Sequence, residues 1–109
     1  MQCTCLPLLS CAEGSQLYVY TAPTALGPYT YQGDANINAT GGRVVHGQST
    51  AVLPLCTSNG TQYLWLSDRW QSTKMWSTDL QYWGLLEFAA GGEVKPVVWK
   101  DSFQVDLVV

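Results

Sequence analysis

Apolar and polar residues alternate along this chain in short runs, and the clearest of these runs lie between residues 48 and 70. Residues 48–55 (QSTAVLPL) and 61–70 (TQYLWLSDRW) flank the turn sequence at residues 57–60 (TSNG). Asn and Gly tolerate the positive φ angles that tight hairpin turns require, so this pattern predicts two strands of one hairpin. Polar residues stand at the outer ends of both strands, where they would meet a shared cavity.

The rest of the chain also favours β structure, because no segment repeats apolar residues at helical spacing. A strand is predicted at residues 17–21, a turn at 22–28, a second strand at 29–32 and a long irregular loop at 33–47. Further strands are predicted at residues 49–56, 61–67, 74–87 with a break near 80–82, and 94–99, followed by a tail at 103–109. Gly-rich sequence at residues 90–92 supplies another turn. These spacings predict an all-β antiparallel meander.

Large apolar side chains occupy consecutive positions at residues 63–66 (YLWL), so both faces of this predicted strand are apolar. Leaving either row exposed would forfeit ~25 cal/mol for each Å² unburied, which predicts a strand covered on both sides. A β-propeller achieves this by stacking four-stranded blades of about 40 to 50 residues around a channel. We therefore predict about one to one and a half blades of a propeller. The missing blades, or self-association, would be needed to cover them.

The composition is that of a globular protein and argues against several partners. The 109 residues carry a net charge of −3, with 47% hydrophobic and 12% charged residues, and no basic stripe is present to neutralise phosphates. Nucleic acid is therefore not an expected partner. No apolar run approaches the ~18 residues of a membrane-spanning helix, so we expect no membrane segment.

The first twelve residues (MQCTCLPLLSCA) have a short apolar centre without a positive region before it, which makes a poor secretory signal. We leave residues 1–15 unassigned and treat residues 16–109 as the predicted partial propeller. Two Asn-X-Thr sequences, at Asn38 and Asn59, would accept glycans in a secreted protein. They are compatible with secretion, and we expect the protein to be extracellular.

The cysteine and histidine pattern does not predict a metal site. Cys3, Cys5, Cys11 and Cys56 show none of the C-x-x-C spacing of zinc sites, and His46 has no second histidine to join it. We predict neither a metal nor another cofactor.

A series of short motifs occurs in order between residues 17 and 107. They are GPYT at residues 27–30, QST at 48–50 and DRW at 68–70, with Trp76 and Leu80 beyond. In this order they resemble the carboxy-terminal part of the catalytic propeller of glycoside hydrolase family 43, most closely its exo-β-1,3-galactanase-like branch. The resemblance implies part of a five-bladed propeller that removes terminal sugars by inversion, with acidic residues contributed by earlier blades.

The chain departs from the family pattern at two places. Ser67 stands where the family usually has Gly, and residues 75–80 (MWSTDL) replace a more usual Y-V-W-L-P-L, which leaves the packing of the third strand open. Trp65, Trp83 and Trp99 are predicted to pack between blades, as buried tryptophans commonly do.

Inverting hydrolysis needs a carboxylic acid and a base roughly 6.5 to 9.5 Å apart. Asp68 is the carboxylate whose motif is expected to face the channel, and the acid would have to come from elsewhere. The resemblance implies that Gln48 occupies the position where a base would orient the nucleophilic water. A neutral amide is a poor base in bulk water, so this catalytic role requires a preorganised site. Alternatively, Gln48 begins a strand and hydrogen-bonds a neighbouring blade.

Further candidate substrate-binding residues flank these two positions. They are His46, Ser49, Arg69 and Trp70, together with Asp68 itself. The indole of Trp70 suits stacking on a sugar ring, because it combines a flat apolar face with an N–H edge. Structural alternatives stay open: Asp68 and Arg69 would form a local ion pair, and His46 would be a loop residue without a role.

Three functional hypotheses remain from the sequence. The first is a fragment of an inverting glycosidase for galactan-type or related polysaccharides, inactive by itself because the acid lies elsewhere. The second is a small carbohydrate-binding β-module without catalysis, which uses Tyr63 and Trp70. The third is a product without activity whose uncovered sheet edges promote aggregation. Whether the chain is an enzyme is left open.

Overall fold

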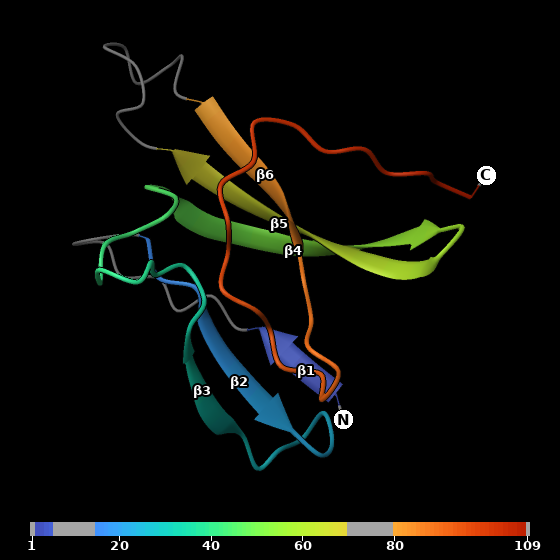
Figure 1. Cartoon of the computed structure of the whole chain (residues 1–109). Helices are drawn as coiled ribbons and strands as arrows, with labels where there is room; N and C mark the ends of the chain where they lie inside the picture. The colour runs from blue at the N-terminus through green and yellow to red at the C-terminus, as the bar shows by residue number, and fades with distance from the viewer. Residues whose placement is uncertain (1, 6–14, 70–79, 109) are drawn as a thin grey trace.

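The protein is built from antiparallel β-strands in two three-stranded sheets (Figure 1). A computed structural model describes residues 2–5, 15–69 and 80–108, and this part of the chain contains no helix. The strands are β1 (Gln2–Cys5), β2 (Tyr18–Ala22), β3 (Thr30–Asp34), β4 (Gln48–Thr57), β5 (Gly60–Arg69) and β6 (Leu80–Leu86). The predicted all-β antiparallel class is confirmed, whereas the propeller blades stay a prediction.

The first sheet has the strand order β1-β2-β3. β1 pairs along its whole length with β2, although the sequence pattern assigned no strand to this segment. Val19 and Thr21 of β2 are buried beneath the sheet. On the other face, the ring of Tyr31 contacts Tyr18 and Tyr20, with centroid distances of 5.7 and 5.3 Å. The first sheet therefore has one face in the core and one face covered by tyrosines.

The second sheet is a meander in the order β4-β5-β6, and it contains the predicted hairpin. The turn places Gly60 at a φ of 103°, a conformation that favours glycine. The Thr57 hydroxyl closes this turn, because it donates a 2.6 Å hydrogen bond to the Gly60 carbonyl and accepts one of 3.3 Å from the Asn59 backbone N–H. The register then runs from Thr57 opposite Gly60 to Gln48 opposite Asp68, with a bulge near Thr50.

Two strand predictions differ from the structure. The predicted break near residues 80–82 is wrong, because β6 pairs with β5 continuously from Leu80 to Leu86; residues 74–79 of the same prediction lie outside the described part. The predicted strand at 94–99 is also wrong. Only Val94 forms a bridge, to Phe88, and Pro96 has no N–H to donate to a ladder.

The segment after β6 crosses towards the first sheet and then returns past β6, as the orange-to-red trace of Figure 1 shows. The Val97 N–H donates a 2.7 Å hydrogen bond to the carbonyl of Ala35, which belongs to the loop after β3. The chain end then reaches the β4–β5 hairpin, where Leu107 forms a bridge with Thr57. This segment therefore joins both sheets instead of extending either one.

The core lies between the two sheets and includes residues from both. Its buried members are Leu17, Val19, Ala35, Val45, Trp65, Tyr82 and Leu86. Trp65 is the largest of them and is 1% exposed; its ring meets Tyr82 edge-on, with centroids 6.0 Å apart. Its indole N–H donates a 3.1 Å hydrogen bond to the Ser49 hydroxyl, so the polar edge of the ring is satisfied inside the core.

The irregular loop predicted at residues 33–47 is largely confirmed, because the chain forms no strand between β3 and β4. Asn36 holds it in place and is fully buried. Its side-chain amide donates to the carbonyls of Ser15 and Val45 over 2.6 and 2.7 Å, and its oxygen accepts the Val45 N–H over 2.9 Å. This side chain thus supplies buried hydrogen bonds that fix the loop, beside the Ile37–Arg43 bridge within it.

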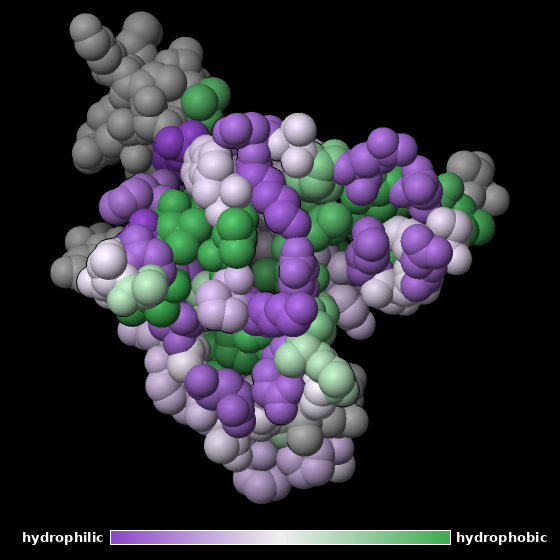
Figure 2. All heavy atoms as spheres, viewed as in Figure 1, coloured by the Kyte–Doolittle hydropathy of each residue, from purple (hydrophilic) through white to green (hydrophobic). Residues whose placement is uncertain are grey.

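The outer face of the second sheet is apolar as well, as the consecutive apolar residues predicted. Side chains alternate between faces along a strand, which places Leu64 and Leu66 of β5 on the side opposite Trp65. Their neighbours Leu53 of β4 and Trp83 of β6 are 45% and 51% exposed. On the side of the molecule that Figure 2 shows, hydrophobic and hydrophilic residues are mixed. The described part of the chain leaves this outer face partly uncovered.

Candidate functional site

A row of polar side chains crosses the second sheet where β4 begins and β5 ends. Gln48 lies opposite Asp68, and Asp68 lies opposite Gln81 on β6. Cross-strand partners share one face of a sheet, so the predicted catalytic glutamine and the predicted aspartate lie on the same face, with Asp68 between the two amides. The side-chain amide of Gln81 donates a 3.1 Å hydrogen bond to Asp68. The structure therefore brings together Gln48 and Asp68, as the sequence predicted.

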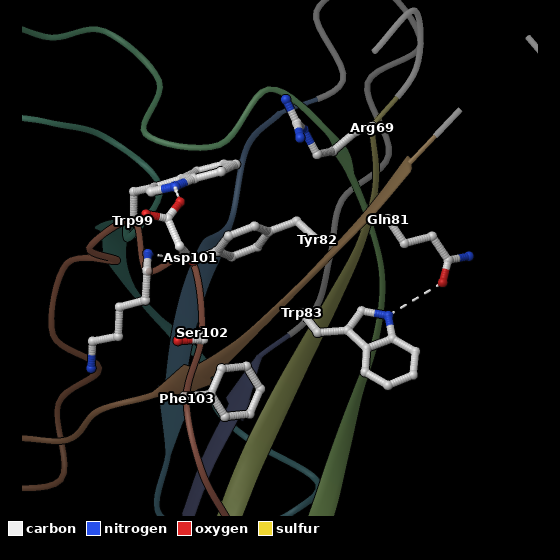
Figure 3. Close-up of a pocket in the computed structure, with 9 residues that line it drawn as sticks. Arg69, Gln81, Tyr82, Trp83, Trp99, Asp101, Ser102 and Phe103 are labelled. Atoms are coloured by element: carbon white, nitrogen blue, oxygen red, sulfur yellow. Dashed lines mark hydrogen bonds between the residues drawn. The ribbon is translucent and has the colours of Figure 1, made fainter. Parts of the chain in front are cut away.

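A groove of about 500 Å³ adjoins this row and runs along β6 and the returning segment after it (Figure 3). Three of its aromatic side chains are partly exposed: Trp83 at 51%, Trp99 at 42% and Phe103 at 36%. Polar groups of Arg69, Gln81, Lys100, Asp101 and Ser102 complete its lining. Apolar ring faces beside a few directed polar groups are typical of small-molecule sites.

The groove and the polar row are connected by hydrogen bonds. The indole N–H of Trp83 donates to the Gln81 side-chain oxygen over 3.2 Å, and the Gln81 amide in turn donates to Asp68. Figure 3 shows the bond between Trp83 and Gln81. Gln81 therefore uses its donor and its acceptor to hold Trp83 at a set orientation relative to Asp68. Through Gln81, the predicted site residue Asp68 therefore helps to fix the orientation of Trp83 in the groove.

On the other side of β6, Trp99 packs in a stack of three groups. Its ring lies 4.7 Å from that of Tyr82, measured between centroids, and the guanidinium carbon of Arg69 lies 5.1 Å from the Trp99 ring centre. The Trp99 indole N–H donates a 2.9 Å hydrogen bond to Asp101. A cation over an aromatic ring is attracted by the negative face of the ring, so Arg69 and Trp99 hold each other in place.

Lys100 lies at the edge of the groove and pairs with Glu87 over 2.8 Å. The hydrogen bond and the charge of Lys100 hold the pKa of Glu87 below its ordinary value of 4.5, and Glu87 in turn raises the pKa of Lys100 above 10.5. A lowered pKa keeps a carboxyl group ionised near neutrality, which opposes a role for Glu87 as a general acid. The Lys100 backbone N–H also donates to the Tyr82 hydroxyl over 3.2 Å.

The other predicted site residues occupy different environments. Ser49 is 4% exposed; its hydroxyl accepts from Trp65 and lies 3.3 Å from the Gln16 carbonyl, so the contacts that the structure shows are structural. His46 is exposed and is not among the residues that line the groove. Trp70 lies outside the described residues. Substrate binding by these three residues stays a prediction.

The ion-pair alternative for Asp68 and Arg69 is not what the structure shows. As consecutive residues of one strand they point to opposite faces of the sheet. The ion pairs within the described residues are instead Arg43 with Asp34, and Lys100 with Glu87. Asp68 therefore belongs to the polar row, and Arg69 to the stack with Trp99.

The groove tryptophans are the functional candidates that the sequence pattern did not select. Trp65, Trp83 and Trp99 were all predicted to pack between blades, yet only Trp65 is in the core. The alternation along β6 contained a signal, because Gln81 and Trp83 are two residues apart and so share a face opposite Tyr82. Nothing in the local sequence indicated that Trp99 returns to the same strand.

The described residues contain no group of three or more His, Cys, Asp or Glu side chains placed to hold a metal ion. Nor does any helix in this part of the chain have the length and hydropathy to cross a membrane. The chain matches no protein-family profile, no curated protein and no solved structure.

Proposed function

We propose that this protein binds carbohydrate in the groove along β6, without hydrolysing it by itself. The observation that carries the proposal is the partly exposed aromatic lining of the groove, formed by Trp83, Trp99 and Phe103. Sugar rings present apolar C–H faces and polar edges, and aromatic rings beside hydrogen-bonding groups complement both. The resemblance to family 43 adds galactan-type saccharides as the expected ligand class.

The polar groups of the groove favour a bound saccharide over a purely apolar ligand. Asp101 accepts from the Trp99 indole, and Gln81 accepts from the Trp83 indole, so each tryptophan is held by its edge while its ring remains partly exposed. A ring whose orientation is already set loses less entropy when a ligand stacks on it. The other carboxylate oxygen of Asp101 and the Ser102 hydroxyl can bond sugar hydroxyls.

Isothermal titration of the 109-residue chain with β-1,3-galactooligosaccharides tests this proposal. We expect binding, and Trp83→Ala should weaken it by about tenfold, as is common for a buried aromatic contact at a binding hot spot. Tyr31→Ala is the matched control, because Tyr31 is 53% exposed but lies on the first sheet. Equal weakening by both variants, or no binding by the native chain, would refute the proposal.

A second candidate function is that this chain forms part of the catalytic propeller of a family-43-like inverting glycosidase. The register that places Gln48 beside Asp68 favours it, as does the partly uncovered outer face that carries Leu53 and Trp83. Such a face would pack against a neighbouring blade. Gln48 would orient the nucleophilic water, and an acid on another blade would protonate the leaving oxygen. Because inversion requires two opposed groups, the isolated chain should release no sugar.

Nuclear magnetic resonance separates the two candidates. If Gln48 contributes to a saccharide site, galactooligosaccharide should shift its side-chain amide resonances together with the indole resonance of Trp83. A shift of Trp83 alone would leave the groove as the binding site and remove the support for Gln48. A reducing-sugar assay on the same samples should detect no hydrolysis, and sustained turnover would contradict both candidates as stated.

A further inference from the structure

We infer that the groove selects saccharides carrying an anionic group, and that Arg69 is the residue that recognises it. This inference rests on the proposed carbohydrate-binding function and specifies its ligand class. Arg69 is the last residue of β5 and lines the groove with Trp99 and Ser102. Its position in the groove, its stacking on Trp99 and the absence of an ion pair with it among the described residues together support the inference.

The Arg69 side chain is held so that its guanidinium stays in the groove. Its stem passes close to Gly47, where an added Cβ would lie 3.3 Å from the Arg69 Cγ. The guanidinium carbon then lies 5.1 Å from the centre of the Trp99 ring. Arginine stacks on aromatic faces while its planar fork of N–H groups remains available at the edges, so this placement prepares the group to bind a planar anion.

Within residues 2–5, 15–69 and 80–108, the Arg69 side chain makes no hydrogen bond. Its Nε is buried and has no hydrogen-bond partner. Of the nearby carboxylates, Asp68 accepts from Gln81 and Asp101 accepts from Trp99. No ion pair within residues 15–69 and 80–108 includes Arg69, since the two pairs recorded there involve Arg43 and Lys100. A groove ligand would not reach this buried Nε, so an anion would be bound by the terminal N–H groups of the guanidinium.

A carboxylate suits Arg69 better than a neutral hydroxyl does. Guanidinium and carboxylate form two parallel, charge-assisted hydrogen bonds, whereas a hydroxyl offers a single oxygen without charge. A sulfate ester presents the same anionic oxygens in a non-planar arrangement. Sugar acids and sulfated sugars therefore share the chemistry that Arg69 recognises, and the planar carboxylate of a uronic acid is the ligand that we expect to bind most tightly.

The test compares three disaccharides that differ at one carbon atom. They are β-1,3-galactobiose, the same disaccharide with its terminal C6 oxidised to a carboxylate, and the same disaccharide with a 6-O-sulfate, each titrated into the 109-residue chain. We expect the carboxylate form to bind at least about tenfold more tightly than the neutral form. Raising the salt concentration from about 0.05 to 0.5 M should reduce this preference, because salt screens the charge.

Substitutions test whether Arg69 causes the preference for the anionic disaccharide. Arg69→Gln should abolish the preference, so that the carboxylate form loses its advantage over the neutral form, and Arg69→Lys should keep part of the preference, because the charge remains without the fork. Lys95→Gln is the control, since it removes a positive charge outside the groove. Preference for the sulfate instead of the carboxylate would still support anion recognition by Arg69 if Arg69→Gln removed it.

The outcomes separate this inference from the proposed function. Equal binding of neutral and anionic disaccharides by the native chain overturns the inference and leaves carbohydrate binding intact. A preference that survives in Arg69→Gln also overturns it, because another group would then be responsible. Absence of binding by all three disaccharides overturns the proposed function itself. If Arg69→Gln does not fold, Arg69→Lys still tests the assignment, because it keeps the charge and removes the fork.

Discussion

Gly47 and Ser67 approach each other so closely that no side chain fits between them: a Cβ added at Gly47 would lie 2.4 Å from the Ser67 hydroxyl oxygen. The same Cβ would lie 2.9 Å from the Asp68 carbonyl oxygen. Ser67 is fully buried, and its hydroxyl has no hydrogen-bond partner. This contact sets how closely the loop before β4 passes over the end of β5, where Asp68 and Arg69 begin the candidate site.

Gly47→Ala should therefore destabilise the fold by about 1–3 kcal/mol, the usual cost of forcing extra atoms into a packed interior. Urea denaturation followed by circular dichroism measures this change. Ser67→Gly in the Gly47→Ala background removes the closest contact and should restore part of the stability. An unchanged denaturation midpoint for Gly47→Ala would show that the loop is free to move away.

Ser49→Ala should act on stability and leave saccharide binding unchanged. The Ser49 hydroxyl is the acceptor for the indole N–H of Trp65 inside the core, and losing it leaves a buried donor unpaired at a cost of about 1–3 kcal/mol. Thr50→Ala is the control, because Thr50 is exposed and its hydroxyl bonds only the Leu66 carbonyl. Thermal unfolding reports the stability and titration reports the affinity. Lost affinity at unchanged stability would instead place Ser49 in contact with the saccharide.

Asn36→Ala should be among the most destabilising single substitutions in the loop between β3 and β4. It leaves the Val45 N–H and the carbonyls of Val45 and Ser15 without the partner that Asn36 provides, a loss on the order of 3 kcal/mol. Asn38→Ala in the same loop removes exposed hydrogen bonds and should cost about 1 kcal/mol or less. Guanidinium denaturation of the two variants compares them directly, and similar midpoints would contradict the assigned role of Asn36.

The Glu87–Lys100 pair should stabilise the fold only in a defined pH range. The pKa of Glu87 is lowered, so its contribution is present above its ordinary pKa of 4.5 and is lost as the pH falls through the lowered value. The pKa of Lys100 is raised, so its contribution is present below 10.5 and is lost as the pH rises through the raised value. Both side chains are about half exposed, so the effect is small and salt should weaken it further.

Glu87→Gln tests this pair. The variant should have a slightly lower melting temperature than the native chain at neutral pH and low salt. The difference should shrink at high salt, and also at acid pH once Glu87 of the native chain is protonated. Glu93→Gln serves as the control, because Glu93 belongs to neither recorded ion pair. A difference that persists unchanged into acid would assign the effect of Glu87 to packing instead of charge.

The sequence was sufficient for the β4–β5 hairpin because the information there is local. Short apolar runs specified β4 and β5, and the Asn59-Gly60 turn joined them with the register that places Gln48 beside Asp68. Such runs and turn chemistry act over a few residues, so they can be recognised without knowing what else the chain contacts.

The sequence was misleading where a segment is defined by distant partners. Residues 94–99 have the composition of a strand, yet the Val97 N–H bonds the loop after β3 instead of a neighbouring strand. β1 was missed because residues 1–15 were left unassigned from the sequence, and the strand is defined by its pairing with β2. In both cases the tertiary partner, and not the local preference, determined the structure.

The sequence by itself therefore determined the all-β class, the hairpin, the polar row that contains Gln48 and Asp68, and the apolar character of both faces of β5. Only the tertiary structure decided that Trp83 and Trp99 share a groove and that Arg69 stacks on one of them. The physical reason is distance along the chain. Strand pairing and turn geometry depend on neighbouring residues, whereas the groove exists only because the segment after β6 leaves its sheet, contacts the other one and returns.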